Sequence, residues 1–255
     1  MNRKITIQRQ TSPSVYPTAM GLIIGALILV LIFTTSCQPR EPQAINQIQH
    51  TLEVDAVLVD LTLAELHPVI AQNKNGENFR DMVERLRPDA AINGTFYNEN
   101  CRPLGDIVVN GKLVNKGHYP NAFAVTNSGK AVIIRGTRNN INWKGYKVGI
   151  AAGPRLVVNG KVHLNPNADG FRMASLKIRA RRSGIGITKD GKLLLVSTKK
   201  PFTLKEFAEI MVRLGAVDAL NLDGGGACGL YVDGKFLISP LLPMSNILVV
   251  YKKKI

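Results

Sequence analysis

The sequence has few of the residues from which metal and redox sites are built. It contains three cysteines, four histidines and one tryptophan among 255 residues. No two cysteines stand at the C-x-x-C spacing typical of zinc sites. No group of His and Asp resembles the ligand sets of two-metal hydrolases. We therefore predict no metal ligands and no cofactor, and leave metal assistance open.

Acidic residues are also scarce. The chain has 18 acidic and 33 basic residues, a formal net charge of +15. Three of the basic residues, Arg3, Lys4 and Arg9, precede an apolar leader. The basic excess favours anionic partners, and nucleic acid, anionic lipid headgroups and phosphate-bearing glycans all qualify. A soluble surface of basic sign is the alternative.

Only one long hydrophobic run is present, at residues 19–33, and Thr-Thr-Ser-Cys follows it at residues 34–37. A basic start, an apolar run and small residues predict an export signal. The run is shorter than the roughly 20 residues of a transmembrane helix. Cys37 resembles a bacterial lipoprotein acylation site, and an uncleaved signal anchor is the alternative. Either way we expect an extracytoplasmic, membrane-tethered protein at the periplasm or cell surface.

The rest of the chain is long enough for one domain with a full core. Residues 1–37 are expected to be the leader or anchor, residues 38–50 a flexible polar spacer containing Pro39 and Pro42, and residues 51–255 a single catalytic domain. Cys101 and Cys228 are the other two cysteines. In an exported protein they could form a disulfide, and two free thiols are equally compatible with the sequence.

Short β-prone runs alternate with tight-turn dipeptides after residue 54. Such dipeptides join the strands of β-hairpins. They are Asn110-Gly111, Ser128-Gly129, Asn159-Gly160, Asp190-Gly191 and Asp233-Gly234. Helical periodicity occurs only near residues 78–86 and 203–214, and Thr203 and Glu206 form a capping box in the second segment. The predicted fold class is α+β, with mainly antiparallel sheets built from hairpins and a few flanking helices.

The most unusual segment is Asn-Leu-Asp-Gly-Gly-Gly at residues 221–226, where an apolar strand ends in a carboxylate. Consecutive glycines cost backbone entropy, so they indicate close approach to a ligand or amides offered to an anion. The segment lacks the Gly-Lys-Ser/Thr ending of a nucleotide P-loop. A flexible turn is the alternative.

Three other segments carry candidate functional residues. Residues 91–98 form a short apolar strand that ends in polar residues, among them Asn93, Thr95 and Tyr97. Residues 89–93 and 218–221 each follow a predicted helix and form a short strand that ends in asparagine, so we expect the two following loops to meet. Arginines at residues 179–182 lead into a strand, and Arg155 precedes a hairpin; arginine suits bidentate phosphate binding. A solvated basic face is the alternative.

These segments, in this order, resemble the phosphodiester glycosidase domain family. The resemblance runs from about Val54 to Tyr251. The matching motifs are Asn93 to Tyr97, Gly153 to Leu156, Arg182 to Gly186 and Leu214 to Gly226. It implies cleavage of a sugar-1-phosphodiester at the glycosidic bond, with release of free sugar and a phosphomonoester. It also implies a phosphate-bearing glycan as the partner, and no nucleic acid.

Glycosyl transfer passes through an oxocarbenium-like state that a carboxylate stabilises, and a phosphate leaving group needs little protonation. We expect Asp223 to act as nucleophile or base. The other expected catalytic residues are Asn93 and Arg182; the expected substrate contacts are Tyr97, Thr95, Arg155, Asn221, Gly224, Gly225 and Gly226. Asp106 is a reserve carboxylate. Two departures from the family pattern are Ala227, where serine is usual, and Leu242, near a usual arginine.

Two other functions remain open from the sequence. A noncatalytic module for anionic cell-envelope polysaccharide would use the same basic pocket without turnover. A phosphodiesterase that cuts the P–O bond usually needs clustered metal ligands, which the sequence lacks. Loss of turnover with retained binding in Asp223→Asn would distinguish an enzyme from a module.

Overall fold

The computed structural model describes residues 43–51, 53–171 and 177–254. The chain divides into two compact units, residues 1–40 and 41–255, and the description concerns the second. The predicted export signal and Cys37 lie outside the described residues. None of the helices within the described ranges is long and apolar enough to span a membrane.

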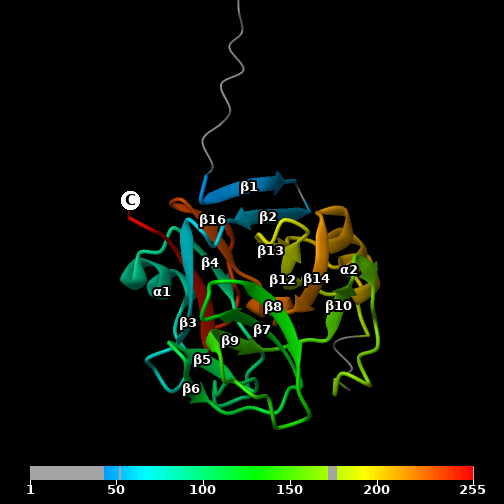
Figure 1. The fold of residues 1–255 in the computed structure, drawn as a ribbon. Helices are drawn as coiled ribbons and strands as arrows, with labels where there is room; N and C mark the ends of the chain where they lie inside the picture. The colour runs from blue at the N-terminus through cyan, green and yellow to red at the C-terminus, as the bar shows by residue number, and fades with distance from the viewer. Residues whose placement is uncertain (1–42, 52, 172–176, 255) are drawn as a thin grey trace, which may run out of the picture. The chain divides into compact units, whose positions relative to one another are not determined.

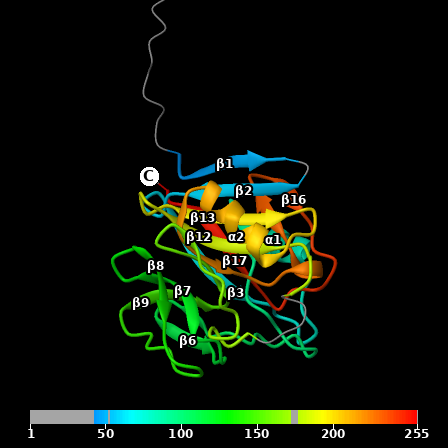
Figure 2. The same cartoon turned by 90° about the vertical axis from the view of Figure 1, so that its right-hand side faces the viewer.

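Three antiparallel sheets make up the domain (Figures 1 and 2). The first has the order β1 (Ile45–His50), β2 (Val54–Val59), β13 (Leu193–Thr198), β12 (Ser183–Thr188), β14 (Ala216–Asn221), β10 (Arg155–Val158) and β11 (Lys161–Val162). The second has the order β16 (Lys235–Ile238), β15 (Leu230–Val232), β4 (Ala90–Asn93), β17 (Asn246–Lys252) and β3 (Ala64–Ile70). The third has the order β6 (Lys112–Asn115), β5 (Ile107–Val109), β9 (Tyr146–Ala151), β7 (Asn121–Thr126) and β8 (Ala131–Arg135).

The five predicted hairpins are all present. They are the pairs β5–β6, β7–β8, β10–β11, β12–β13 and β15–β16. At the first of these turns Asn110 and Gly111 have φ of 49° and 77°, the left-handed conformation that a two-residue turn requires. The predicted α+β class with mainly antiparallel sheets is therefore confirmed.

Two α-helices of the described residues lie on the outer faces of the sheets. Helix α1 (Phe79–Leu86) has Asn78 as its N-cap, and α2 (Leu204–Arg213) begins with the predicted Thr203 and Glu206 capping box. Buried side chains of α1 pack with those of β4 and β17, and buried side chains of α2 pack with those of β10, β13 and β14. Both helices agree with the predicted segments.

The prediction of a flexible spacer up to residue 50 is wrong for its last six residues. Ile45–His50 form strand β1, which pairs antiparallel with β2 at the edge of the first sheet. Ile45 is buried and the polar side chains beside it stay partly exposed. The polar composition did not predict this strand, because an edge strand is held mainly by backbone hydrogen bonds, which require few apolar side chains.

Alternate residues of the central strands face two different cores. In β13, Leu193 and Leu195 join the core shared by the three sheets, whereas Leu194 and Val196 pack with α2. Strands that are buried on both faces are held in one register relative to their neighbours. This rigidity matters where two of them, β4 and β14, end side by side.

Candidate active site

The site lies where β4 and β14 end. The Asp223 amide donates to the Gly94 carbonyl at 3.1 Å, and Asn93 Nδ2 donates to the Asp223 carbonyl at 2.8 Å. The two polar loops, 130 residues apart in sequence, are therefore in direct contact. The hypothesis that both asparagine loops reach one place is confirmed.

Asn93 holds the site together through the backbone. Its Oδ1 accepts from the Gly229 amide at 3.1 Å while its Nδ2 donates to Asp223, and the residue is 1% exposed. Both ends of the amide thus fix the segments on either side of the glycine loop. One N–H of Nδ2 and one lone pair of Oδ1 are therefore engaged within the protein, at a side chain with little exposed surface for the predicted catalytic contact. It is a positioning residue.

Asn246 and Thr95 form a second clamp beneath the site. The Thr95 amide donates to Asn246 Oδ1 at 2.8 Å, and Asn246 Nδ2 donates to the Thr95 carbonyl at 3.0 Å. Thr95 Oγ1 donates to the Ala151 carbonyl at 2.7 Å and the residue is 1% exposed. The predicted substrate contact by Thr95 is not supported, because its hydroxyl is buried and donates to the Ala151 carbonyl. Gly94 is required beside it, since an added Cβ would stand 1.9 Å from Asn246 Oδ1.

Asp223 is the carboxylate at the centre of the site. Burial raises its pKa to about 6, and the hydrogen bond from the Gly224 amide to Oδ1, at 2.8 Å, lowers it in part. Burial raises the pKa of Tyr97 to about 12, and the negative charge of Asp223 adds to that rise. The pKa of Tyr119 is raised by the same two causes. Two tyrosines that stay protonated at neutral pH therefore lie within the field of one carboxylate.

The glycine loop turns back immediately after this carboxylate as a short 3-10 helix, η2 (Gly225–Ala227). The Gly224 amide donates to Asp223, and the Gly225 amide donates to the Arg181 carbonyl at 2.8 Å. Two of the three glycine amides thus have acceptors within the protein. The prediction that all three face an anion is not supported for Gly224 and Gly225.

Arg181 is the arginine attached to this loop. Its Nε donates to the Gly225 carbonyl at 3.0 Å, opposite the bond from the Gly225 amide. Its Nη2 is buried and has no hydrogen-bond partner among the described residues. A buried guanidinium nitrogen without an acceptor is costly, and a ligand oxygen would satisfy it. The cluster at residues 179–182 therefore brings one arginine, Arg181, into contact with the glycine loop.

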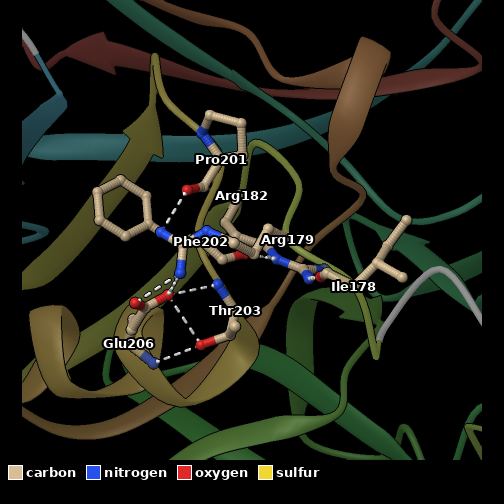
Figure 3. A network of polar contacts seen from close by, with 7 residues as sticks. All are labelled: Ile178, Arg179, Arg182, Pro201, Phe202, Thr203 and Glu206. Atoms are coloured by element: carbon tan, nitrogen blue, oxygen red, sulfur yellow. Dashed lines mark hydrogen bonds and ion pairs between the residues drawn. The ribbon is translucent and has the colours of Figure 1, made fainter.

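Arg182 and Arg179 are engaged elsewhere (Figure 3). Arg182 is 2% exposed, donates through Nε to the Phe202 carbonyl at 3.0 Å and through Nη2 to the Ile178 carbonyl, and burial lowers its pKa. Arg179 binds both carboxylate oxygens of Glu206, at 2.7 and 2.8 Å. The predicted phosphate contact by Arg182 is therefore not supported. The sequence places three arginines close together and does not distinguish the one that contacts the glycine loop.

Arg155 faces an acid of its own chain. Its amide donates to Asp169 Oδ2 at 3.0 Å, its Nε lies 3.9 Å from Asp169 Oδ1, and its Nη2 lies 3.3 Å from His163 Nε2. Asp169 is fully buried and also binds Arg135 at 2.8 Å. Arg155 therefore shares one carboxylate with Arg135, and its buried Nε has no hydrogen-bond partner among the described residues, so the predicted substrate contact by Arg155 stays a prediction.

Asn221 and Tyr97 border the site in different ways. Asn221 is 1% exposed and its Nδ2 donates to the Leu222 carbonyl at 2.7 Å, while its Oδ1 has no partner among the described residues. Tyr97 is partly exposed and its hydroxyl donates to the Pro243 carbonyl at 2.7 Å. Tyr97 thus fixes the loop before β17 to the side of Asp223, with part of its surface still accessible to a ligand.

The two remaining cysteines, Cys101 and Cys228, are both free thiols, which decides between the alternatives left by the sequence. Cys228 is buried, and burial raises its pKa to about 11. Within the described ranges no three His, Cys, Asp or Glu side chains are grouped so as to hold a metal ion.

Asp106 has a structural role. It is 2% exposed and accepts from Trp143 Nε1 at 2.8 Å, the Gly117 amide at 2.6 Å and Lys116 Nζ at 3.2 Å. We expect Asp106→Asn to lower the free energy of unfolding by about 1–3 kcal/mol because buried donors lose a charged acceptor. Turnover per folded molecule should stay within about twofold. Urea unfolding and activity at matched folded fraction measure both, and a large loss of turnover in folded protein would restore Asp106 as a catalytic candidate.

The fold and the site define a β-rich protein that carries a partly buried carboxylate beside a glycine loop, with an arginine bonded to the loop and two tyrosines within the field of the carboxylate. The chain belongs to the phosphodiester glycosidase family, whose sequence model matches residues 87–251. The matched range contains every residue of the site described above. No curated protein sequence matches the chain.

Solved structures share this fold at low sequence identity. The catalytic domain of zebrafish N-acetylglucosamine-1-phosphodiester alpha-N-acetylglucosaminidase, auto-inhibited by its pro-peptide, superposes with a TM-score of 0.70 at 15% identity, over 84% of this chain and 85% of that one. A hypothetical protein from Synechocystis gives 0.59 at 20% identity, over 82% and 61%. A putative exported protein from Burkholderia pseudomallei gives 0.60 at 16% identity, over 78% and 73%.

Proposed function

We propose that the protein is a hydrolase that cleaves the glycosidic bond of sugar-1-phosphodiesters in exported glycans or wall polymers. The products are a free sugar and a phosphomonoester. The observation that carries this proposal is a partly buried carboxylate at the start of the glycine loop together with an arginine that is hydrogen-bonded to the same loop. Asp223 can stabilise the positive charge that develops on the sugar in the transition state. Arg181 Nη2 has no hydrogen-bond partner among the described residues and can donate to a phosphate oxygen.

In the proposed reaction the bond between the anomeric carbon and the phosphate oxygen breaks. Its electron pair leaves with the phosphate, whose low basicity removes the need for a strong general acid. Asp223 either attacks the anomeric carbon or takes a proton from the attacking water. The water supplies the hydroxyl of the free sugar and, in net terms, one proton to solution or to the phosphate.

The other residues position these groups. Asn93 fixes the backbone of Asp223, and Gly94 lets β4 and the glycine loop approach closely. Tyr97 stays protonated at neutral pH because its pKa is about 12, so it can act only as a neutral neighbour of the carboxylate. Arg181 is held by the Gly225 carbonyl, which presents its remaining nitrogens beside the loop.

The pH dependence of turnover tests the state of the carboxylate. Asp223 must be ionised to act as nucleophile or base, and its pKa is raised to about 6 by burial. We expect kcat/KM to rise tenfold per pH unit below about pH 6 and to level off near pH 7. The measurement is hydrolysis of one sugar-1-phosphodiester between pH 4 and 8. A profile that falls over this range as the pH rises would show that the protonated carboxyl is the active form.

A screen of synthetic sugar-1-phosphodiesters, with identification of the products, tests the reaction itself. Free sugar together with a phosphomonoester supports the proposal. A sugar phosphate with a free alcohol would indicate cleavage of the P–O bond. Wild-type protein that binds anionic polysaccharide but hydrolyses none of the diesters would identify a noncatalytic binding module.

The cellular setting is part of the proposal. The basic and apolar start of the chain and Cys37 support a membrane-tethered protein outside the cytoplasm. A phosphate-bearing glycan, and not nucleic acid, is the proposed partner, and it matches the basic excess of the chain.

A further inference from the structure

An exposed apolar segment borders the glycine loop. Residues 240–243, Pro-Leu-Leu-Pro, precede β17 and form what we call the leucine lip. Leu241 is 78% exposed and Leu242 is 52% exposed, and Leu241 is the most exposed large apolar side chain of the described residues. Neither leucine therefore contributes much to the folding of the domain through burial.

The lip is fixed to the site and not merely near it. The Leu241 amide donates to the Gly226 carbonyl at 2.7 Å. Leu242 Cδ1 lies 2.9 Å from the position that a Cβ on Gly226 would occupy, so this leucine rests on the glycine loop. At the other end of the lip the Pro243 carbonyl accepts from the hydroxyl of Tyr97, whose pKa responds to Asp223.

The side chains of the lip offer no charged or polar group to a ligand. All four side chains are apolar, in a chain with 33 basic residues. The two prolines restrict the backbone on either side of the leucines. This restriction limits how far the leucine side chains can turn toward the core. An apolar surface that is continuous with a binding site suits a ligand group that is itself apolar.

We propose that the leucine lip binds the alcohol portion of the phosphodiester and that this alcohol is a long-chain, lipid-like one. The inference rests on the proposed function. With the phosphate at Arg181 and the sugar at Asp223, an alkyl chain leaving the phosphate would pass over Gly226 onto Leu242 and Leu241. A second sugar at this place would find no side-chain donor or acceptor in the lip.

The test uses the full chain and a series of diesters of one sugar whose alcohol is methyl, butyl, hexyl or octyl, kept below micelle-forming concentrations. In the wild type we expect kcat/KM to rise about two- to fourfold per methylene until the lip is covered, because each buried methylene adds to binding. In the double variant Leu241→Ser, Leu242→Ser the octyl-to-methyl ratio of kcat/KM should fall at least tenfold.

Leu113→Ser is the matched control. Leu113 is 43% exposed on the edge strand β6 of the third sheet, and it should keep the wild-type ratio. A wild type with no dependence on chain length, or a double variant that keeps the dependence, overturns the inference while leaving the proposed function intact. If the double variant no longer sediments with anionic vesicles but keeps the dependence on chain length, the lip is a membrane contact instead. If the wild type hydrolyses none of the diesters, including the methyl one, the proposed function itself fails.

Discussion

Asp223→Asn is expected to lower kcat on a sugar-1-phosphodiester by about 10³-fold or more, the usual scale for loss of a nucleophile or base. The amide is neutral, so it can neither attack the anomeric carbon nor accept a proton from water. The Gly224 amide can still donate to Oδ1, as it does at 2.8 Å in the wild type, so the loop geometry should be kept. Steady-state kinetics and binding of a non-hydrolysed analogue give the two quantities.

The same substitution should make the protein more stable at high pH. Burial raises the pKa of Asp223 from 3.8 to about 6, so the folded state binds this proton more tightly than the unfolded state. The resulting stabilisation is present below about pH 4 and is lost as the pH rises through about 6. Above pH 7 the ionised group costs at most about 3 kcal/mol. Asp223→Asn should therefore exceed the wild type in unfolding free energy at pH 8 and differ little at pH 4.

Asp218→Asn is the control for both effects. Asp218 lies on β14, the strand that leads to the site, and its side chain accepts only weakly, from the Asn159 amide at 3.4 Å. It should leave turnover and its pH profile unchanged. A gain in stability at pH 8 together with lost turnover marks Asp223 as a functional group kept at a cost in stability. Full activity in Asp223→Asn would contradict the proposed mechanism.

Arg181→Lys is expected to lower kcat/KM about 10²-fold, with most of the change in KM. Lysine keeps the positive charge but cannot bind a phosphate oxygen while also donating from the same planar group to the Gly225 carbonyl. The unpartnered Nη2 is the atom whose loss should be felt. Inhibition by inorganic phosphate should weaken in parallel, which can be measured by competition at fixed substrate concentration.

Arg182→Lys is the matched comparison, since it changes the neighbouring arginine in the same way. Its two hydrogen bonds to the Phe202 and Ile178 carbonyls hold the chain near β12. We expect a loss of about 1–3 kcal/mol in unfolding free energy and little change in the phosphate inhibition constant of the folded protein. The reverse result, with phosphate affinity lost only in Arg182→Lys, would return the phosphate contact to Arg182.

Local signals in the sequence were sufficient for the hairpins and the helices. Asn110-Gly111 specifies its own turn because two adjacent residues must adopt positive φ, and Thr203 with Glu206 specifies the start of α2 through bonds within one helical turn. Local signals did not predict strand β1, because its position depends on pairing with the free edge of β2 and not on its own side chains.

The glycine loop was determined by the sequence in one respect and by the tertiary structure in another. A strand that ends in Asp223 and continues into three glycines shows by itself that a carboxylate stands beside a loop without side chains. Which groups share that place depends on contacts between distant segments, such as Asn93 with Asp223 and Arg181 with Gly225. Local sequence cannot specify them because side-chain direction near a strand end depends on the packing of whole sheets. For that reason the sequence by itself predicted a carboxylate at the start of the glycine loop, and only the tertiary structure showed that Arg181, not Arg182, is hydrogen-bonded to that loop.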